Sequence, residues 1–323
     1  MQKTLAVVNL KKLKQNALFV RKILGDRTFY AVVKANAYGH GGARVALAIE
    51  NIVDGFCVAI TDEGAALRIS GITKPILVLT PPLGDDDIAR AKFYNLTVTV
   101  NSVAAAKAAR GLDFHIKVNT GMNRLGCSPD ELLSVLGAAD PNGIRGVYSH
   151  LYLPSDRRAS EEQLKLFEVA QKAVKRVNPE ATAHIAASGG ILSGEKFLKD
   201  GARCGILLYG YSPEGFSAPV EPILTVYARR TQVTEFIGGG AGYALAPKKY
   251  ETLSAYRLGY ADGFFRTCPL GVGNLCMDSF VREGGDELVR VFSDADDYAL
   301  KCKTISYEAL CSVTRRAEMV YEE

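Results

Sequence analysis

The feature that most constrains the fold of this sequence is a regular alternation of apolar runs and amphipathic stretches between Thr28 and Gly210. The apolar runs are TFYAVVK, GFCVAI, PILVLT, LTVTV, DFHIKV, IRGVYSH, ATAHIAAS and ARCGILLYG. Helical patterns such as TDEGAALRI and EEQLKLFEVAQKAVKRV separate most of them. Near-continuous hydrophobic strands separated by helices pair in parallel, with both faces of the sheet covered. Eight such runs favour an α/β fold, a (β/α)₈ barrel, over an open doubly wound sheet.

A second pattern begins after Ser212. ILTVYARRTQVTEF alternates apolar and polar residues, GGGAG predicts a turn, and LSAYRLGY, ELVRVF and ALKCKTI are typical of short strands. We therefore expect two domains, a barrel domain over residues 1–215 and a β-rich domain over residues 216–323. Residues 1–9 precede the first barrel strand and could pair with the second domain.

Composition excludes several classes of function. The 323 residues carry a net charge of +4, which makes no case for nucleic acid or an anionic membrane as partner. No apolar stretch is long enough for a signal peptide or a membrane span, so we expect a cytoplasmic protein. The seven cysteines never form a CxxC pair, which indicates reduced thiols. The four histidines show no HxxxH spacing, so no metal site is expected.

The first apolar run ends in a lysine, within AVVKANAYGHG. Burying an ammonium group without a partner is costly. One interpretation of Lys34 is therefore a Schiff-base lysine whose pKa is lowered by its surroundings. The other is a structural lysine that extends from the strand end into solvent. Composition alone leaves both open.

The same string, Ala31–Gly41, resembles the alanine racemase signature around the lysine that carries pyridoxal phosphate. Other motifs of that family follow in order along nearly the whole chain: KVNTGMNRLG, SHL, HIAASGGIL, RCGILLYG, LGYADGFFR, LCMD and ISYE. The sequence is thus identified as a member of the alanine racemase family, which are fold-type III pyridoxal-phosphate enzymes. The resemblance implies a barrel followed by a β-rich domain.

The resemblance also implies four catalytic residues. Lys34 would bond covalently to pyridoxal 5′-phosphate and act as one acid/base group, with Tyr260 as the second on the opposite face. His150 and Arg203 would form a hydrogen-bonded chain behind Tyr260, and Arg203 would face the ring nitrogen of the cofactor. A guanidinium has a pKa above 12, so it donates a hydrogen bond without giving up its proton. Without the family, Tyr260 would more simply be a half-buried strand residue and Arg203 a surface arginine.

The cofactor phosphate is expected after the seventh and eighth barrel strands, where many barrels bind phosphate through backbone N–H groups. Ser188, Gly205 and Ile206 match those positions of the family. Tyr38 and Tyr307 match tyrosines that supply hydroxyl groups to the cofactor.

Three further residues match positions that serve the substrate. Arg124 matches an arginine that faces the cofactor phenol oxygen and the substrate carboxylate. Met277 would offer its backbone N–H to that carboxylate, although a methionine of this kind is more often core packing. Lys117 matches a lysine that is carbamylated in many members and orients the arginine.

The chain departs from the family pattern at several places. Asn119 replaces an aspartate, and Ala187 replaces an asparagine. The segment Arg266–Cys276 is shorter than usual, as if a β-hairpin were missing, and Asn274 stands where an arginine is common. The LYLPSD segment after His150 also differs from the usual pattern. The identity of the substrate is therefore less constrained than the type of reaction.

The resulting hypothesis is a two-base racemase that interconverts L- and D-alanine and supplies D-alanine for peptidoglycan. The alternatives are a racemase for serine or a broader set of small amino acids, a related decarboxylase, and a non-catalytic pyridoxal-phosphate carrier. The family further implies a homodimer whose active sites are shared between chains, because Lys34 lies on the first barrel strand while Tyr260 and Met277 lie in the second domain.

Overall fold

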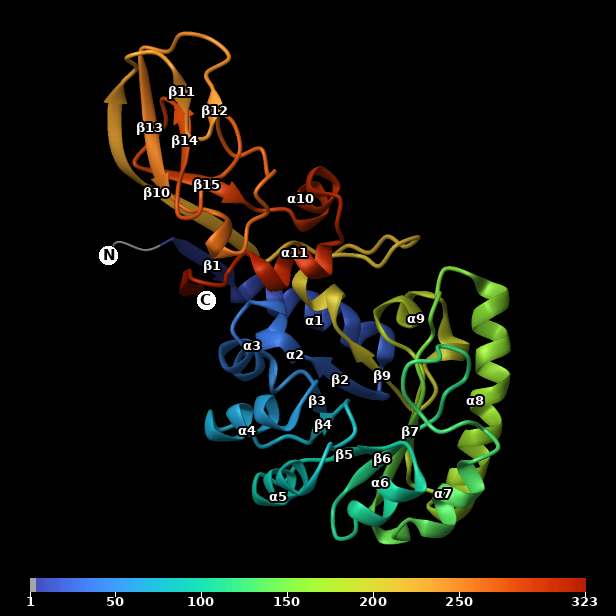
Figure 1. Cartoon of the computed structure of the whole chain (residues 1–323). Helices are drawn as coiled ribbons and strands as arrows, with labels where there is room; N and C mark the ends of the chain where they lie inside the picture. The colour runs from blue at the N-terminus through green and yellow to red at the C-terminus, as the bar shows by residue number, and fades with distance from the viewer. Residues whose placement is uncertain (1–3) are drawn as a thin grey trace. The chain divides into compact units, whose positions relative to one another are not determined.

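The computed structural model describes residues 4–323 and forms two compact units, whose elements are labelled in Figure 1. The barrel unit comprises Leu13–Ala37 and Gly42–Val220. The β unit comprises the residues up to Lys12 together with Tyr38–Gly41 and Glu221–Glu323. The two domains drawn from the sequence, 1–215 and 216–323, stay a prediction, and residues 1–3 lie outside the described part of the chain.

Parallel pairing closes the strands of the barrel unit into a ring, and most of these strands are labelled in Figure 1. They are β2 (Thr28–Val32), β3 (Gly55–Val58), β4 (Ile76–Val78), β5 (Val98–Val100), β6 (Phe114–Lys117), β7 (Ile144–Tyr148), β8 (Thr182–His184) and β9 (Gly201–Cys204). Two four-stranded sheets, in the orders β4-β3-β2-β9 and β5-β6-β7-β8, make up the ring. Parallel bridges Leu77–Thr97 and Ala187–Arg203 join them at both seams. The predicted (β/α)₈ barrel is confirmed.

The helices of this part of the chain are α1 (Leu10–Leu24), α2 (Lys34–Tyr38), α3 (Gly42–Ile49), α4 (Thr61–Ile69), α5 (Asp85–Phe93), α6 (Val103–Ala108), α7 (Leu132–Ala138), α8 (Arg157–Val177) and α9 (Ser188–Leu192), with 3₁₀ turns η1 (Pro141–Gly143), η2 (Glu195–Phe197) and η3 (Ile206–Tyr209). Among them, α4 and α8 coincide with the predicted stretches TDEGAALRI and EEQLKLFEVAQKAVKRV, whereas α2 is a short left-handed turn. In α8 the buried residues Leu164, Phe167, Ala170 and Val174 recur at spacings of three and four. One face of α8 therefore packs on the barrel, along β7.

The β unit is built on one mixed sheet in the order β14-β13-β10-β1-β16, with β15 also paired to β10 (Figure 1). Its elements are β1 (Leu5–Asn9), β10 (Leu224–Glu235), β11 (Gly240–Ala241), β12 (Ala244–Leu245), β13 (Thr252–Arg257), η4 (Tyr260–Asp262), β14 (Phe280–Glu283), β15 (Leu288–Phe292), α10 (Ala295–Cys302), α11 (Ser306–Ser312) and β16 (Glu318–Glu322). The N-terminal β1 lies antiparallel to β10 and parallel to β16.

One predicted strand of this region is wrong. The segment ALKCKTI, residues 299–305, is not a strand, since its first half completes helix α10. The carboxylate of Asp294 accepts the backbone N–H groups of Asp296 and Asp297 and so caps the start of the helix. Lys303 then takes a left-handed conformation that ends it. The capping aspartate, which favours a helix, was a stronger local signal than the short alternating pattern of ALKCKTI, which favours a strand.

Candidate active site

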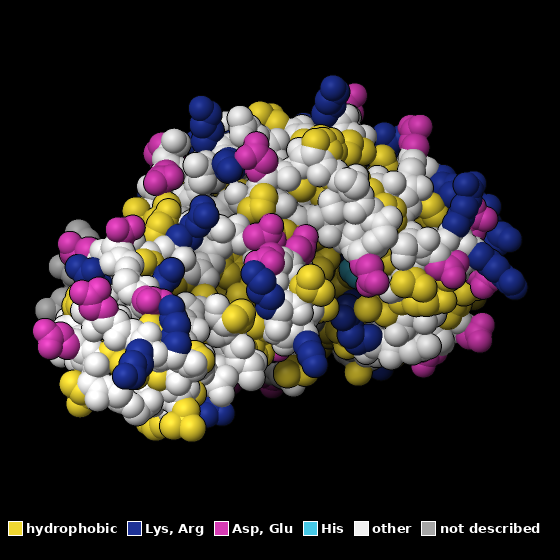
Figure 2. Space-filling view, turned by 90° about the horizontal axis from the view of Figure 1, so that it is seen from above, with side chains coloured by type: hydrophobic (Ala, Val, Ile, Leu, Met, Phe, Trp, Pro, Cys, Tyr) yellow, Lys and Arg dark blue, Asp and Glu magenta, His cyan; other side chains and the backbone are white. Residues whose placement is uncertain are grey.

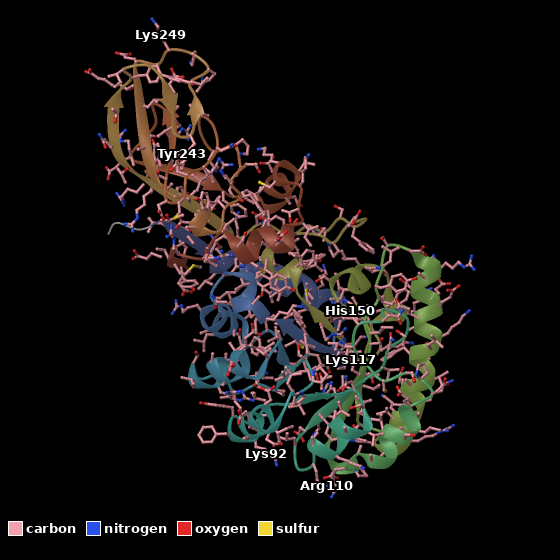
Figure 3. The ribbon with its side chains drawn as sticks, viewed as in Figure 1. Lys92, Arg110, Lys117, His150, Tyr243 and Lys249 are labelled. Carbon is pink, nitrogen blue, oxygen red and sulfur yellow. The ribbon has the colours of Figure 1, made fainter. Side chains whose placement is uncertain are left out.

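The predicted barrel residues lie at the carboxyl ends of different strands. Lys34 follows β2, Lys117 ends β6, His150 follows β7, Ser188 follows β8 and Gly205 follows β9. Because all strands of a parallel barrel point the same way, these ends meet on one face, which is where barrel enzymes place their chemistry. Figure 3 shows Lys117 and His150 within this unit.

Arg203 is buried inside the barrel and held by acceptors from two neighbouring strands. Its Nη1 donates to Nδ1 of His184 at 2.7 Å and to the carbonyl of the same residue at 2.9 Å. Its Nη2 donates to the carbonyl of Ser149 at 2.6 Å and lies 3.3 Å from Nδ1 of His150. These contacts fix the plane of the guanidinium. The surface-arginine interpretation of Arg203 does not fit its burial.

The histidines around Arg203 are neutral. A guanidinium can only donate, so Nδ1 of His184 and Nδ1 of His150 must accept, and the remaining proton of each ring is on Nε2. Desolvation, reinforced first by Arg203, lowers the pKa of His150 to about 3. The same causes lower the pKa of His184 well below its usual value. His184 Nε2 lies 2.8 Å from Nδ1 of His115, a second buried ring behind it.

Positive charge gathers beside this network without carboxylate partners. Lys117 is buried, and desolvation followed by the charges of Arg203, Arg124 and Lys34 lowers the pKa of its ammonium to about 7. The Lys117 ammonium lies 5.2 Å from the centre of the Tyr148 ring. Within residues 4–323, Lys117, Arg124 and Arg203 form no ion pair. Such an excess of cations is suited to an anionic ligand.

The two turns predicted to hold a phosphate are tied to each other. Ser188 begins α9, Ile206 begins η3, and the backbone N–H of Gly205 donates to Oγ of Ser188 at 3.0 Å. The first N–H groups of a helical turn lack partners within it and favour an anion. The glycines after Ser188 have a packing reason: a Cβ on Gly189 would come 2.4 Å from the side chain of Pro154.

The backbone after Lys34 is strained. Ala35, Asn36, Ala37 and Tyr38 all have φ between 51° and 54°, a left-handed turn that costs L-residues roughly 1–2 kcal/mol each. The carboxylate of Glu63 holds its start, accepting the N–H of Ala35 and of Ala59 at 2.6 Å each. Strain of this kind persists where surrounding contacts impose it, often at functional sites.

The remaining predicted residues belong to the β unit. Tyr260 and Met277 have exposed side chains, and the rings of Tyr38 and Tyr307 lie 6.1 Å apart. The carbonyl of Met277 accepts the N–H of Ala261 at 3.0 Å. The N–H of Met277 has no acceptor anywhere in the described chain. The candidate residues thus form two groups, one in each unit.

The backbone that carries Tyr260 is rigidly held. The carboxylate of Asp262 accepts the N–H of Gly259 at 2.8 Å and pairs with the guanidinium of Arg316 through two contacts of 2.9 Å. Arg316 also binds Asp278 at 2.8 Å, next to Met277. The pair between Asp262 and Arg316 therefore links the two segments that present Tyr260 and Met277.

The departure at Asn119 preserves a structural role. Its Oδ1 accepts the N–H of Gly121 at 3.1 Å and the N–H of Asn123 at 3.0 Å, and so shapes the loop before Arg124. A carboxylate oxygen could accept both bonds equally. The amide additionally donates to Oδ1 of Asn123. Nothing in the structure explains the alanine at 187.

Several residues with clear roles were not found from the sequence. Glu63, Gln163, His184 and Arg316 each contact predicted site residues or their loops. Only His184 stood in a recognised motif. The other three are polar residues of ordinary helical or loop segments, and no local pattern distinguishes them.

The described residues were also compared with the requirements of a metal site and of a membrane span. Among residues 4–323, no cluster of three metal-ligating side chains is present, and no helix is both long and apolar enough to cross a membrane. Figure 2 shows basic and acidic side chains interspersed over most of the face it displays. No extended patch of one sign is seen on that face.

Comparison with known proteins places this geometry in context. Residues 8–213 match the family model described as "Alanine racemase, N-terminal domain". A protein of Cutibacterium acnes named alanine racemase is 32% identical, and the match covers 97% of this chain and 96% of that protein. The structure of alanine racemase from Clostridium difficile superposes with a TM-score of 0.91 at 27% identity, covering 100% and 96% of the two chains. The Bacillus anthracis alanine racemase with bound L-Ala-P gives a TM-score of 0.88 at 26% identity, covering 100% and 96%.

Proposed function

The chain belongs to the alanine racemase family and is an amino-acid racemase, and we propose that it interconverts L- and D-alanine with pyridoxal 5′-phosphate attached to Lys34. The observation that carries this proposal is the buried Arg203, fixed by His184, Ser149 and His150 at the end of the barrel where Lys34 and Ser188 emerge. The proposed product would supply peptidoglycan synthesis.

The donors of the barrel unit fit the cofactor. Ser188 offers a hydroxyl and Ile206 a turn N–H group for a phosphate, while Gly205, the third proposed phosphate residue, uses its own N–H to hold the Ser188 hydroxyl. Tyr38 and Tyr307 are the proposed hydroxyl partners. Arg203 presents a permanent donor, not an acid, to the ring nitrogen. When bound, the cofactor would withdraw electrons from the substrate and acidify its Cα–H.

Two acid/base groups are required because a proton must leave one face of Cα and return on the other. We assign Lys34 to one face and Tyr260 to the other. Arg203 occupies Nδ1 of His150, so the Nε2 proton of His150 is free to donate to the phenol oxygen of Tyr260. The hydrogen-bonded series from Arg203 through His150 would hold the phenol oxygen of Tyr260 in place for proton transfer.

Arg124 and Met277 are proposed to bind the substrate carboxylate, through a guanidinium and a backbone N–H. A lysine with a pKa of about 7 is roughly half neutral at neutral pH, so Lys117 can react with carbon dioxide. Its nitrogen would form a bond to carbon and release a proton, giving a carbamate. That anion would pair with Arg124 and orient it.

We further propose a homodimer in which Tyr260 and Met277 of one protomer complete the barrel site of its partner. The exposure of Tyr260 and the unpaired N–H of Met277 support this assignment. The cysteines within residues 4–323 form no disulfide, which supports the predicted cytoplasmic location.

A racemase for serine or another small amino acid is the second candidate. The short Arg266–Cys276 segment favours it, because that region helps line the approach to the site in the family. The decarboxylase and carrier alternatives are not favoured, since relatives that match over nearly the whole chain are named alanine racemases.

The test is a panel of L-amino acids assayed for the D-isomer with the purified protein. We expect alanine to be converted fastest. Serine as the fastest substrate would move the assignment to the second candidate, and no D-isomer from any member would contradict racemisation.

A further inference from the structure

Gln163, on α8, makes a buried hydrogen-bond bridge between two loops of the barrel unit. Its side chain is only 2% exposed, although glutamine is usually a surface residue. Its Oε1 accepts the N–H of Tyr152 at 3.1 Å. Its Nε2 donates to the carbonyl of His150 at 3.0 Å and to Oγ1 of Thr120 at 3.1 Å. All three polar contacts are made within the protein.

The orientation of this amide is fixed by its partners. A backbone N–H can only donate and a carbonyl can only accept, so the Tyr152 N–H must meet the oxygen and the His150 carbonyl must meet the nitrogen. The amide therefore clamps the backbone on both sides of Leu151. A side chain that lacks either a donor or an acceptor cannot replace it.

The third contact reaches the other loop. Thr120 is buried, and its Oγ1 lies 2.7 Å from Oγ of Ser149, whose carbonyl accepts from Arg203. A Cβ added to Gly121 would lie 3.7 Å from Cγ of Gln163, so the stem of the Gln163 side chain lies next to this loop. The loop continues to Arg124, and the clamped segment contains His150.

We propose that Gln163 is a positioning residue that fixes the loop 119–124 relative to the loop 149–152. Gln163 thereby sets the spacing between Arg124 and His150. The effect of this spacing on catalysis rests on the proposed function. A buried, fully satisfied polar network specifies one arrangement, because any shift leaves a desolvated donor or acceptor unpaired.

Hydrogen–deuterium exchange on the intact protein tests the bridge without relying on activity. In Gln163→Met, which keeps the length but removes every polar contact, peptides spanning 118–126 and 149–153 should both exchange at least about tenfold faster. The control is Gln171→Met, a partly exposed glutamine further along the same helix. It should change neither peptide.

Gln163→Glu separates the two arms and protects the test against misfolding of the methionine variant. It keeps an acceptor for the N–H of Tyr152, and its second carboxylate oxygen can accept from the hydroxyl of Thr120, but it has no donor for the carbonyl of His150. The 118–126 peptide should therefore keep more of its protection than in Gln163→Met, while the 149–153 peptide exchanges faster because two acceptors now face each other. If the 149–153 peptide keeps wild-type exchange in every Gln163 variant that folds, Gln163 does not hold the two loops together and the inference is overturned.

Racemisation kinetics then test the catalytic consequence. Small displacements of catalytic groups cost up to about a hundredfold. We expect Gln163→Met to lower kcat through His150 and raise KM through Arg124, while Gln171→Met matches wild type. If the wild type is active and Gln163→Met shows faster exchange but unchanged kcat and KM, the positioning role is overturned. An inactive wild type would contradict the proposed function. The exchange experiment would still show whether Gln163 couples the two loops.

Discussion

The two units present their candidate residues in opposite ways. In the barrel unit, Arg203 is 3% and Lys117 is 6% exposed, and side-chain and backbone acceptors inside the unit hold the guanidinium. In the β unit, Tyr260 is 37% and Met277 is 54% exposed. There the backbone is held by the pair between Asp262 and Arg316, while the phenol and the Met277 N–H remain open.

The difference indicates that the residues of the two units have different roles. Buried groups with lowered pKa values bind and tune a ligand, and they need their own surroundings to be complete. Groups on a rigid but exposed turn are placed to complete a site that lies against them. This is the physical basis for the proposed sharing of sites between protomers.

The largest effect is expected from the barrel side. Lys34→Ala should lower racemisation at least about 10⁴-fold, because both the attachment to the cofactor and one acid/base group disappear. Borohydride reduction followed by mass spectrometry should find the cofactor on Lys34 of the wild-type protein. The exposed Lys92, substituted in the same way, serves as control and should leave the rate unchanged. A label on another lysine would show that the barrel site is assigned to the wrong residue.

A smaller effect is expected on the pH dependence of the free energy of unfolding, to which the buried Lys117 contributes and an exposed lysine does not. The pKa of Lys117 is about 7 in the folded chain and 10.5 in its ordinary state. Between these values the unfolded chain binds more protons, so unfolding free energy should rise with pH in this window. From pH 7 to 9 the contribution is about 2 kcal/mol.

Denaturant unfolding in buffer free of carbon dioxide measures this contribution. Relative to wild type, Lys117→Met should lose the rise, whereas Lys92→Met should keep it. Equal pH dependence in Lys117→Met and wild type would mean that the Lys117 ammonium is not desolvated as the structure implies.

The comparison also explains what the sequence could predict. The strands from β2 to β9 were predicted because near-continuous apolar runs are a strong local signal, and Lys34 and Arg203 were predicted because they lie in specific strings at strand ends. ALKCKTI was mistaken for a strand, since its short pattern is compatible with either structure and the cap at Asp294 decides. Gln163 and Glu63 could not be predicted, because their partners come from distant segments that only the fold brings together.

Mixing two inactive variants tests the shared site most directly. Tyr260→Phe should lower the rate by about 10²–10⁴ through loss of the second acid/base group. In a heterodimer of Lys34→Ala and Tyr260→Phe protomers, one site would carry both changes and the other neither. If chains exchange freely, about half of the dimers are mixed, and activity should return to about one quarter of wild type. Failure to recover activity, with subunit exchange demonstrated independently, would place Lys34 and Tyr260 in the site of a single chain and contradict the account.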